Sequence, residues 1–420
     1  MTDMLDRTKP PVFSQTFELS IPQASTEKKD GTLFHWIHAG KLPAYKVEVI
    51  FRSGGSFYDD HPGTAYLANK MLTYGTSLRS HKDIVGTFDQ YGAFVKVNPG
   101  FDDPEISIYG LNHNAEKVIP VLGDVIHHTT FPSDEFELVR KISIEQLQIQ
   151  NSRNSVQASK LFREALFGKE NQYGRVMEVQ DLEALKAEQV REFFNSNYQN
   201  YEVLSTGLFD AALKSLLEDE LSGGKSSAPV DRYEIPEYVS QVYHEKEKSL
   251  QSSLRVGKIM PHKAHEDYIP VRICLHALGG YFGSRLMKNI REDKGYTYGI
   301  YASIVPLRHT SYMVIGGDVQ KDHRQDAINE IYKEIRRLQQ DVIPERELQM
   351  VRNHLLGSLQ SDLSSPFSLA EKFKGVHLFD MDYSYYDELI DTIQTISADH
   401  IREIAGKYLA QDSITEVSVG

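Results

Sequence analysis

Two segments of the chain carry polar side chains that could do chemistry. The first, residues 63–76, reads GTAYLANKMLTYGT and places Tyr66, Asn69 and Lys70 on one predicted helix. A phenol, an amide and an ammonium group cannot bind Zn²⁺ as imidazoles do, and Lys70 would repel a dication. Asn69 cannot take a proton from a metal-bound water. These residues therefore predict neither a zinc site nor peptide hydrolysis at this segment.

The second segment, residues 279–299, contains Arg291 and Tyr298. We expect a helix that ends at Gly295, a residue suited to the left-handed position after a helix, and a strand that starts near Tyr296. A guanidinium and a phenol can both donate hydrogen bonds to developing negative charge in a confined cleft. The ordinary alternative is that Arg291 pairs with a neighbouring acid and Tyr298 only packs.

The first segment resembles the metal-binding segment of the M16 family of inverzincin peptidases, which reads roughly G-x-A-H-x-x-E-H-M-x-x-x-G-T. Tyr66, Asn69 and Lys70 stand where that family has its first His, its Glu and its second His. The third family ligand, a Glu on the following long helix, aligns with Gln146, whereas Glu145 would point about 100° away. A slip of one residue would restore Glu145, but one carboxylate does not make a zinc site. The resemblance therefore implies a zinc-less member that is inactive by itself.

The second segment is similar to the M16 pattern S-R-L-x-x-x-I-R-E-x-x-G-L-x-Y-S, and Arg291 and Tyr298 match it residue by residue. In active members, an Arg and a Tyr at these positions reach across to the zinc site. There they hold the substrate backbone and the oxygen that becomes negative in the tetrahedral intermediate. The resemblance implies the same substrate and oxyanion binding for Arg291 and Tyr298.

The chain has 420 residues, enough for two domains of about 200 residues with separate cores. A flexible composition, SGGKSSAP, divides it at 222–229. We predict an M16 N-terminal-type domain at 1–221, a linker at 222–236 and an M16 C-terminal-type domain at 237–420. The resemblance implies an α+β fold in which two similar α/β-sandwich halves, each an antiparallel sheet with helices, form a clamshell.

Composition excludes several classes of function. A net charge of −13 argues against a nucleic-acid partner, and the single cysteine, Cys274, excludes a disulfide framework and a cysteine zinc site. Residues 1–13 lack the apolar core of a signal peptide, and no apolar run is long enough to cross a membrane. We therefore expect a cytoplasmic protein.

Two hypotheses about function remain. In heterodimeric M16 members, one chain carries H-x-x-E-H and the other supplies the Arg/Tyr pair. This chain would then be the non-zinc subunit, without a cofactor of its own, and would form a heterodimer with a zinc-bearing M16 subunit, or a homodimer in isolation, acting on an extended peptide. The alternative is a non-catalytic M16-like scaffold or peptide-binding protein. The retained Arg/Tyr pair favours the enzyme subunit, because a scaffold does not need it.

Overall fold

The computed structural model describes residues 21–225, 233, 240–363 and 365–420. Residues 21–225 form the N-terminal half, whose six-stranded sheet has the order β1-β2-β6-β3-β5-β4. Residues 240–420 form the C-terminal half, whose five-stranded sheet has the order β7-β11-β8-β10-β9. The strands are β1 Ser25–Lys29, β2 Thr32–His38, β3 Ala44–Phe51, β4 Phe94–Asn98, β5 Glu105–Leu111, β6 Tyr201–Gly207, β7 Gln241–His244, β8 Gln251–Met260, β9 Thr297–Pro306, β10 Ser311–Gln320 and β11 Thr415–Val419.

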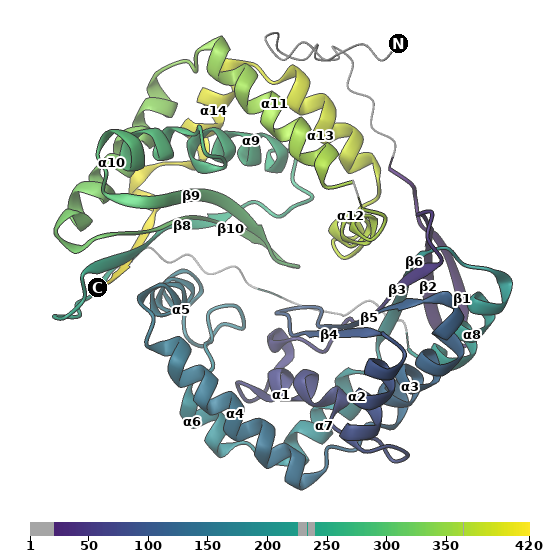
Figure 1. Cartoon of the computed structure of the whole chain (residues 1–420). Helices are drawn as coiled ribbons and strands as arrows, with labels where there is room; N and C mark the ends of the chain where they lie inside the picture. Colours follow the sequence, from purple (N-terminus) through teal and green to yellow (C-terminus); the bar gives the residue numbers. More distant parts are fainter. Residues whose placement is uncertain (1–20, 226–232, 234–239, 364) are drawn as a thin grey trace, which may run out of the picture.

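The two sheets share one topology. In each, the last strand of the half inserts in the middle of the sheet and pairs in parallel with the first common strand, β2 with β6 and β7 with β11. The remaining pairs of the common five strands are antiparallel in both sheets. Strand β1 is an addition to the N-terminal half. The prediction of two similar α+β halves is confirmed, and in Figure 1 they face each other as a clamshell.

Helices cover both sheets. The helices of the N-terminal half are α1 Thr64–Lys70, α2 His81–Gln90, α3 Ala115–His128, α4 Ser133–Asn151, α5 Asn154–Phe167, α6 Val179–Ala184, α7 Ala187–Asn197 and α8 Ala211–Leu221. Those of the C-terminal half are α9 Tyr268–Gly279, the π-helical turn η4 Met287–Asp293, α10 Arg324–Gln340, α11 Glu345–Ser361, α12 Ser368–His377, α13 Ser384–Thr395 and α14 Ala398–Tyr408. Each half has its own apolar core between its sheet and its helices.

The two halves exchange one helix each. Helix α5 belongs to the N-terminal half but packs on β8 and β11, and α12 belongs to the C-terminal half but packs on β6. Figure 1 shows the two helices between the halves, at opposite ends of the clamshell. Every residue of β6 is buried because helices cover both faces of that strand.

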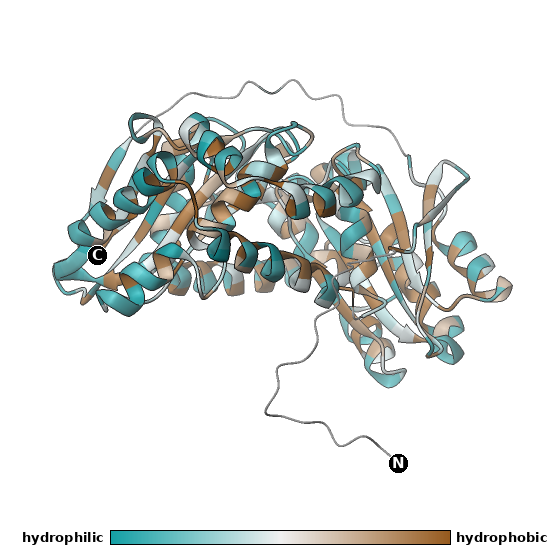
Figure 2. Ribbon diagram, turned by 90° about the horizontal axis from the view of Figure 1, so that it is seen from above, coloured by the Kyte–Doolittle hydropathy of each residue, from teal (hydrophilic) through white to brown (hydrophobic). Residues whose placement is uncertain are grey.

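Small apolar clusters hold the exchanged helices in place. Helix α12 packs Leu369, Ala370 and Phe373 against Ile37, Ile50 and Leu204 of the N-terminal sheet. Helix α5 packs Phe162 and Leu166 against Val314 and Val417 of the C-terminal sheet. In Figure 2 the brown, apolar strand residues of both halves lie beneath helices whose outer residues are teal. The two halves are therefore joined by two small apolar cores at their interface, in addition to the chain connection.

The sequence also predicts strands at 33–37, 45–51 and 201–206, and these are β2, β3 and β6. The helix expected to end near Gly295 is the turn η4, and Gly295 has the expected left-handed φ of 68°. The domain boundaries at 221 and 237 stay predictions. Of the predicted linker 222–236, residues 226–232 and 234–236 lie outside the described part of the chain. Cys274 is buried, as expected of a small apolar side chain.

Candidate functional site

Helix α1, which carries the three substituted motif residues, starts at an unusual turn. Gly63 has a left-handed φ of 95°, which a residue with a side chain rarely adopts, and it has no side chain to cap the helix. The carboxylate of Asp59 does this instead, accepting hydrogen bonds from the Gly63 amide at 3.1 Å and the Ala65 amide at 2.6 Å. The turn fixes the direction in which α1 enters the core.

Helix α4 brings Gln146 to α1, as the sequence alignment predicted. The Lys70 ammonium donates to Gln146 Oε1 at 2.8 Å and to Ser143 Oγ at 3.3 Å. The same ammonium lies 5.0 Å from the centre of the Tyr66 ring, in a cation–π contact. Tyr66, Lys70 and Gln146, which the resemblance aligns with the three ligand positions, therefore lie together as one bonded cluster.

Asn69 takes no part in this cluster. Its side chain is fully buried and lies beside the Tyr198 hydroxyl, which is also buried. Neither the Asn69 amide nor that hydroxyl reaches hydrogen-bond geometry with a described residue. Asn69 therefore faces the core and does not reach a substrate over α1.

The substituted positions do not fit a zinc ion. A catalytic zinc needs three protein ligands, and this cluster offers a phenol, an amide and an ammonium group that points between them. The positive charge of Lys70 lies within this cluster, would repel a dication there, and already has neutral oxygen partners. We therefore derive no catalytic step at this position.

Arg291 and Tyr298 line one hollow on the C-terminal half. Arg291 comes from η4. Tyr298 comes from the start of β9, shortly after Gly295. Both residues border the same depression, together with Gln251 and Gln320 from the ends of β8 and β10. The chain thus brings together the two residues that the second motif singled out.

The ordinary alternative for this pair holds in part for Arg291, which forms an ion pair with a neighbouring acid, and does not hold for Tyr298. The nearest carboxylate oxygen to the Arg291 guanidinium, on Glu292, is 3.9 Å away, beyond hydrogen-bond distance. The guanidinium instead lies 4.4 Å from the centre of the exposed Phe282 ring. Tyr298 is 93% exposed, so its ring does not pack in a core. Tyr298 is therefore open to solvent, and the only ion pair of Arg291 among the described residues is long and partly exposed.

Comparison with known proteins places these features in a family. Residues 44–179 match the family model described as insulinase (peptidase family M16), and residues 184–355 match the model described as peptidase M16 inactive domain. The chain belongs to the M16 peptidase family. The first match contains α1 and α4, and the second contains Arg291 and Tyr298.

Individual relatives agree with this assignment. This M16 chain is 22% identical to the uncharacterized zinc protease YmxG of Bacillus subtilis, over 83% of this chain and 86% of that protein. It is also 22% identical to the non-peptidase homolog YmxG of Helicobacter pylori, over 62% of each chain. A peptidase M16 inactive domain structure from Pseudomonas fluorescens superposes with a TM-score of 0.85 at 21% identity, covering 94% of this chain and 98% of that one. The fold is therefore that of the M16 proteins.

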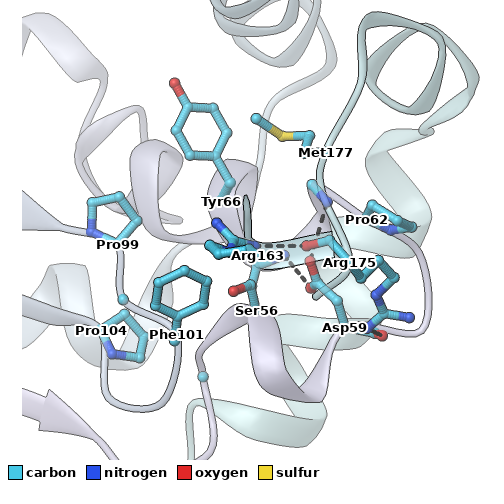
Figure 3. Close-up of a pocket in the computed structure, with 14 residues that line it drawn as sticks. Ser56, Asp59, Pro62, Tyr66, Pro99, Phe101, Pro104, Arg163, Arg175 and Met177 are labelled. Atoms are coloured by element: carbon cyan, nitrogen blue, oxygen red, sulfur yellow. Dashed lines mark hydrogen bonds between the residues drawn. The ribbon is translucent and has the colours of Figure 1, made fainter. Parts of the chain in front are cut away.

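The M16 chain has a further pocket beside α1, which the sequence reading missed. It is bordered by Tyr66, Phe101, Arg163 and Arg175, which come from four segments of the N-terminal half (Figure 3). No sequence motif marks the two arginines. Their meeting depends on how α5 and the loop after it fold back under α1.

One group of side chains in the described ranges has the spacing of metal ligands. His35, Glu202 and His377 place their donor atoms within 4.8 Å of one another, where α12 crosses β2 and β6. One Glu202 oxygen lies 3.2 Å from His35 Nε2 and 2.6 Å from His377 Nε2, and Arg52 donates to the other oxygen at 3.1 Å. Because the Arg52 guanidinium opposes a dication there, we interpret the group as a hydrogen-bonded network between the halves.

This network shifts the protonation of its members. Burial by itself would raise the pKa of Glu202, but the hydrogen bonds from both histidines and the charge of Arg52 hold that pKa well below its usual range. Burial lowers the pKa of His35 despite its hydrogen bond to Glu202. The sequence analysis did not consider Glu202 or His377, because the two residues meet only through α12.

Among the described residues, every helix is too short or too polar to cross a lipid bilayer.

Proposed function

We propose that this chain is the non-zinc subunit of a two-subunit M16 peptidase. Arg291 and Tyr298 would bind the backbone of an extended peptide and the oxyanion formed when a zinc-bearing partner subunit hydrolyses it. The observation that supports the proposal is the common hollow of Arg291 and Tyr298, in which Tyr298 is exposed and Arg291 has, within the described part of the chain, only a long, partly exposed ion pair with Glu292.

This chain lacks the groups that activate a nucleophile but keeps two groups that can stabilise an oxyanion. The bonded cluster of Tyr66, Lys70 and Gln146 leaves this chain without a metal-activated nucleophile. Two donors that suit a developing oxyanion nevertheless remain exposed in the other half. A subunit that only stabilises the charge of the oxyanion needs these two donors and does not need a metal-activated nucleophile.

The test is reconstitution with a zinc-bearing M16 chain from the same genome. Peptidase activity should be at background for this chain alone and far higher for the mixture. Arg291→Ala or Tyr298→Phe should lower the kcat of the complex by about 10²–10³, the usual loss for one oxyanion donor. Because the two side chains act on substrate, size-exclusion chromatography should show that the complex still assembles.

Matched controls make the result specific. Lys288→Ala removes an exposed cation from the same helical turn, outside the hollow, and Tyr301→Phe makes the same chemical change three residues further along β9, also outside the hollow. Both should leave kcat within about twofold. Full activity of the Arg291→Ala and Tyr298→Phe complexes would contradict the proposal.

A second candidate is a non-catalytic scaffold or peptide-binding protein. It is favoured by the Lys70–Gln146 hydrogen bond at the motif, and one relative of similar sequence is named a non-peptidase homolog. This candidate predicts that the zinc-bearing partner is equally active with and without this chain, and that the Arg291 and Tyr298 variants change nothing.

A further inference from the structure

The pocket beside α1 is lined by apolar side chains and by the charged groups of two arginines and one aspartate. Its cavity volume is about 240 Å³, below the range of sites for drug-sized ligands and suited to one side chain or chain end. Figure 3 shows Pro99, Phe101 and Pro104 on one side and Met177 and Pro62 on the other. A small ligand would therefore be enclosed by apolar groups while it reaches the charges beneath.

Arg163 supplies the first of these charges. Its guanidinium donates to the backbone carbonyl oxygens of Tyr173 at 3.0 Å and Arg175 at 2.8 Å, and it lies 4.4 Å from the centre of the Phe101 ring. The third nitrogen, Nη1, has no hydrogen-bond partner among the described residues, and no carboxylate there pairs with the group. Partial burial lowers the pKa of the Arg163 guanidinium, so an anion in the pocket would stabilise its charge.

Arg175 supplies the second charge. Its Nη2 donates to the backbone oxygen of Asp59, and its other two guanidinium nitrogens have no hydrogen-bond acceptor among the residues of the described ranges. The Asp59 carboxylate also borders the pocket but faces the amides at the start of α1. Burial raises the pKa of Asp59 to about 7, so at neutral pH this acid balances only part of the charge of the two arginines.

Arg255 shows how a comparable arginine looks when its role is structural. It is also nearly buried, at 9% exposed, and packs against the same helix, α5. Each of its three nitrogens has an acceptor, on Ser159 at 3.0 Å, on Leu254 at 2.7 Å and on Ser155 at 3.1 Å. Arg163 differs from Arg255 because its Nη1 has no acceptor among the described residues. Arg163 also lines the pocket.

We infer that this pocket binds a carboxylate group of a peptide, held by Arg163 and Arg175, with the adjoining side chain against Phe101 and Met177. A peptide is the expected carrier because the loop 99–104 follows β4, an edge strand of the N-terminal sheet whose outer side has no partner strand within the described chain. An extended peptide can pair with such an edge and lead into the pocket. The carboxylate can come from the chain end or from an acidic side chain.

This site is separate from Arg291 and Tyr298, which lie in the other half, and it needs no partner subunit. Peptide binding by the isolated chain therefore tests it independently of the proposed function. Failure of reconstituted hydrolysis would leave this inference standing, and failure of binding here would leave the oxyanion proposal standing.

The experiment measures fluorescence anisotropy with three labelled heptapeptides of one neutral sequence that ends in leucine. The first has a free C-terminal carboxylate, the second has a C-terminal amide, and the third has the amide with glutamate as its last residue. The free acid, the glutamate peptide or both should bind about 10- to 100-fold more tightly than the neutral amide. Which of the two gains affinity identifies the source of the carboxylate.

Two variants and one measurement on the unmodified chain complete the test. Arg163→Gln should abolish the preference for the carboxylate, whereas the control Arg255→Gln should retain it. Hydrogen exchange of the unmodified chain should slow in 54–66 and 99–104 when the tighter peptide is present, which needs no variant to fold. Equal affinity for all three peptides, binding by none of them, or unchanged exchange in both segments would overturn the inference.

Discussion

Replacing Lys374 by methionine should weaken the attachment of α12 to the opposite half more than any surface change on that helix. The Lys374 ammonium donates to Glu48 at 2.6 Å and to Glu105 at 2.7 Å, both in the N-terminal sheet. A third carboxylate, on Glu371, lies 3.1 Å away. Methionine keeps the length and apolar stem of the side chain, so the change removes mainly the charge.

The magnitude follows from what the carboxylates retain. Glu48 is fully buried, and leaving a buried charge without its partner costs about 3–5 kcal/mol. Glu48 keeps its ion pair with Lys46 at 2.9 Å, and Glu105 keeps a hydrogen bond from Asn98 at 2.7 Å. The negative charges of the two carboxylates therefore lose only part of their stabilisation. We therefore expect a loss near the lower limit, about 3 kcal/mol in the free energy of unfolding.

The assay is equilibrium unfolding in urea, followed by circular dichroism. Lys372→Met is the control, because Lys372 lies two residues earlier on α12 and pairs at 2.7 Å with Asp362, whose side chain is 57% exposed. That exposed pair should be worth about 0.5 kcal/mol. Adding Glu48→Gln to Lys374→Met should restore part of the loss, because the unpaired charge disappears. Equal losses for the Lys372 and Lys374 variants would refute this account of the interface.

Two further predictions concern metal and pH. The purified chain should hold no stoichiometric zinc in elemental analysis after dialysis, and Lys70→His alone should give neither tight zinc binding nor peptidase activity, because Tyr66 and Gln146 still occupy ligand positions. One tightly held zinc per chain, lost on Asn69→Ala plus Gln146→Ala, would contradict this. The free energy of unfolding should fall as the pH drops below about 6.5, since the lowered pKa of His35 keeps it neutral in the folded chain while the unfolded chain takes up a proton. Below about 4.5 the lowered pKa of Glu202 adds to the fall in the same direction, and His35→Gln should flatten the slope between pH 7 and 5, as measured by urea unfolding at each pH. An unchanged slope in that variant would show that other groups dominate the pH dependence.

Much of the fold could be predicted from local sequence patterns. Alternation of Val47, Val49 and Phe51 predicts a strand with one face in a core, and β3 has that form. The opposite face of β3 carries Lys46 and Glu48, which local pattern alone would place in water. Both are buried, because Lys374 and Glu371 reach them from α12, more than 300 positions away in the chain. No local periodicity contains that information.

The candidate sites divide in the same way. Arg291 and Tyr298 could be singled out because one short segment holds both, and a helix followed by a strand brings them to one hollow. The pocket of Arg163 and Arg175 could not, because its walls come from segments separated by more than 100 positions. Its charges are significant because Arg163 has no carboxylate within ion-pair distance among the described residues and Asp59 balances only part of the charge, and both facts depend on packing.

The sequence by itself determined what this chain cannot do at its motif. Whether a side chain can ligate zinc or accept a proton depends on its functional group, and Tyr66, Asn69, Lys70 and Gln146 lack those groups in any fold. The tertiary structure decided how these residues are used instead: Lys70 bridges to Gln146 and Asn69 turns into the core. It also decided which charges are neutralised and which stay free, because the energy of a charge depends on neighbours that only the packed chain supplies.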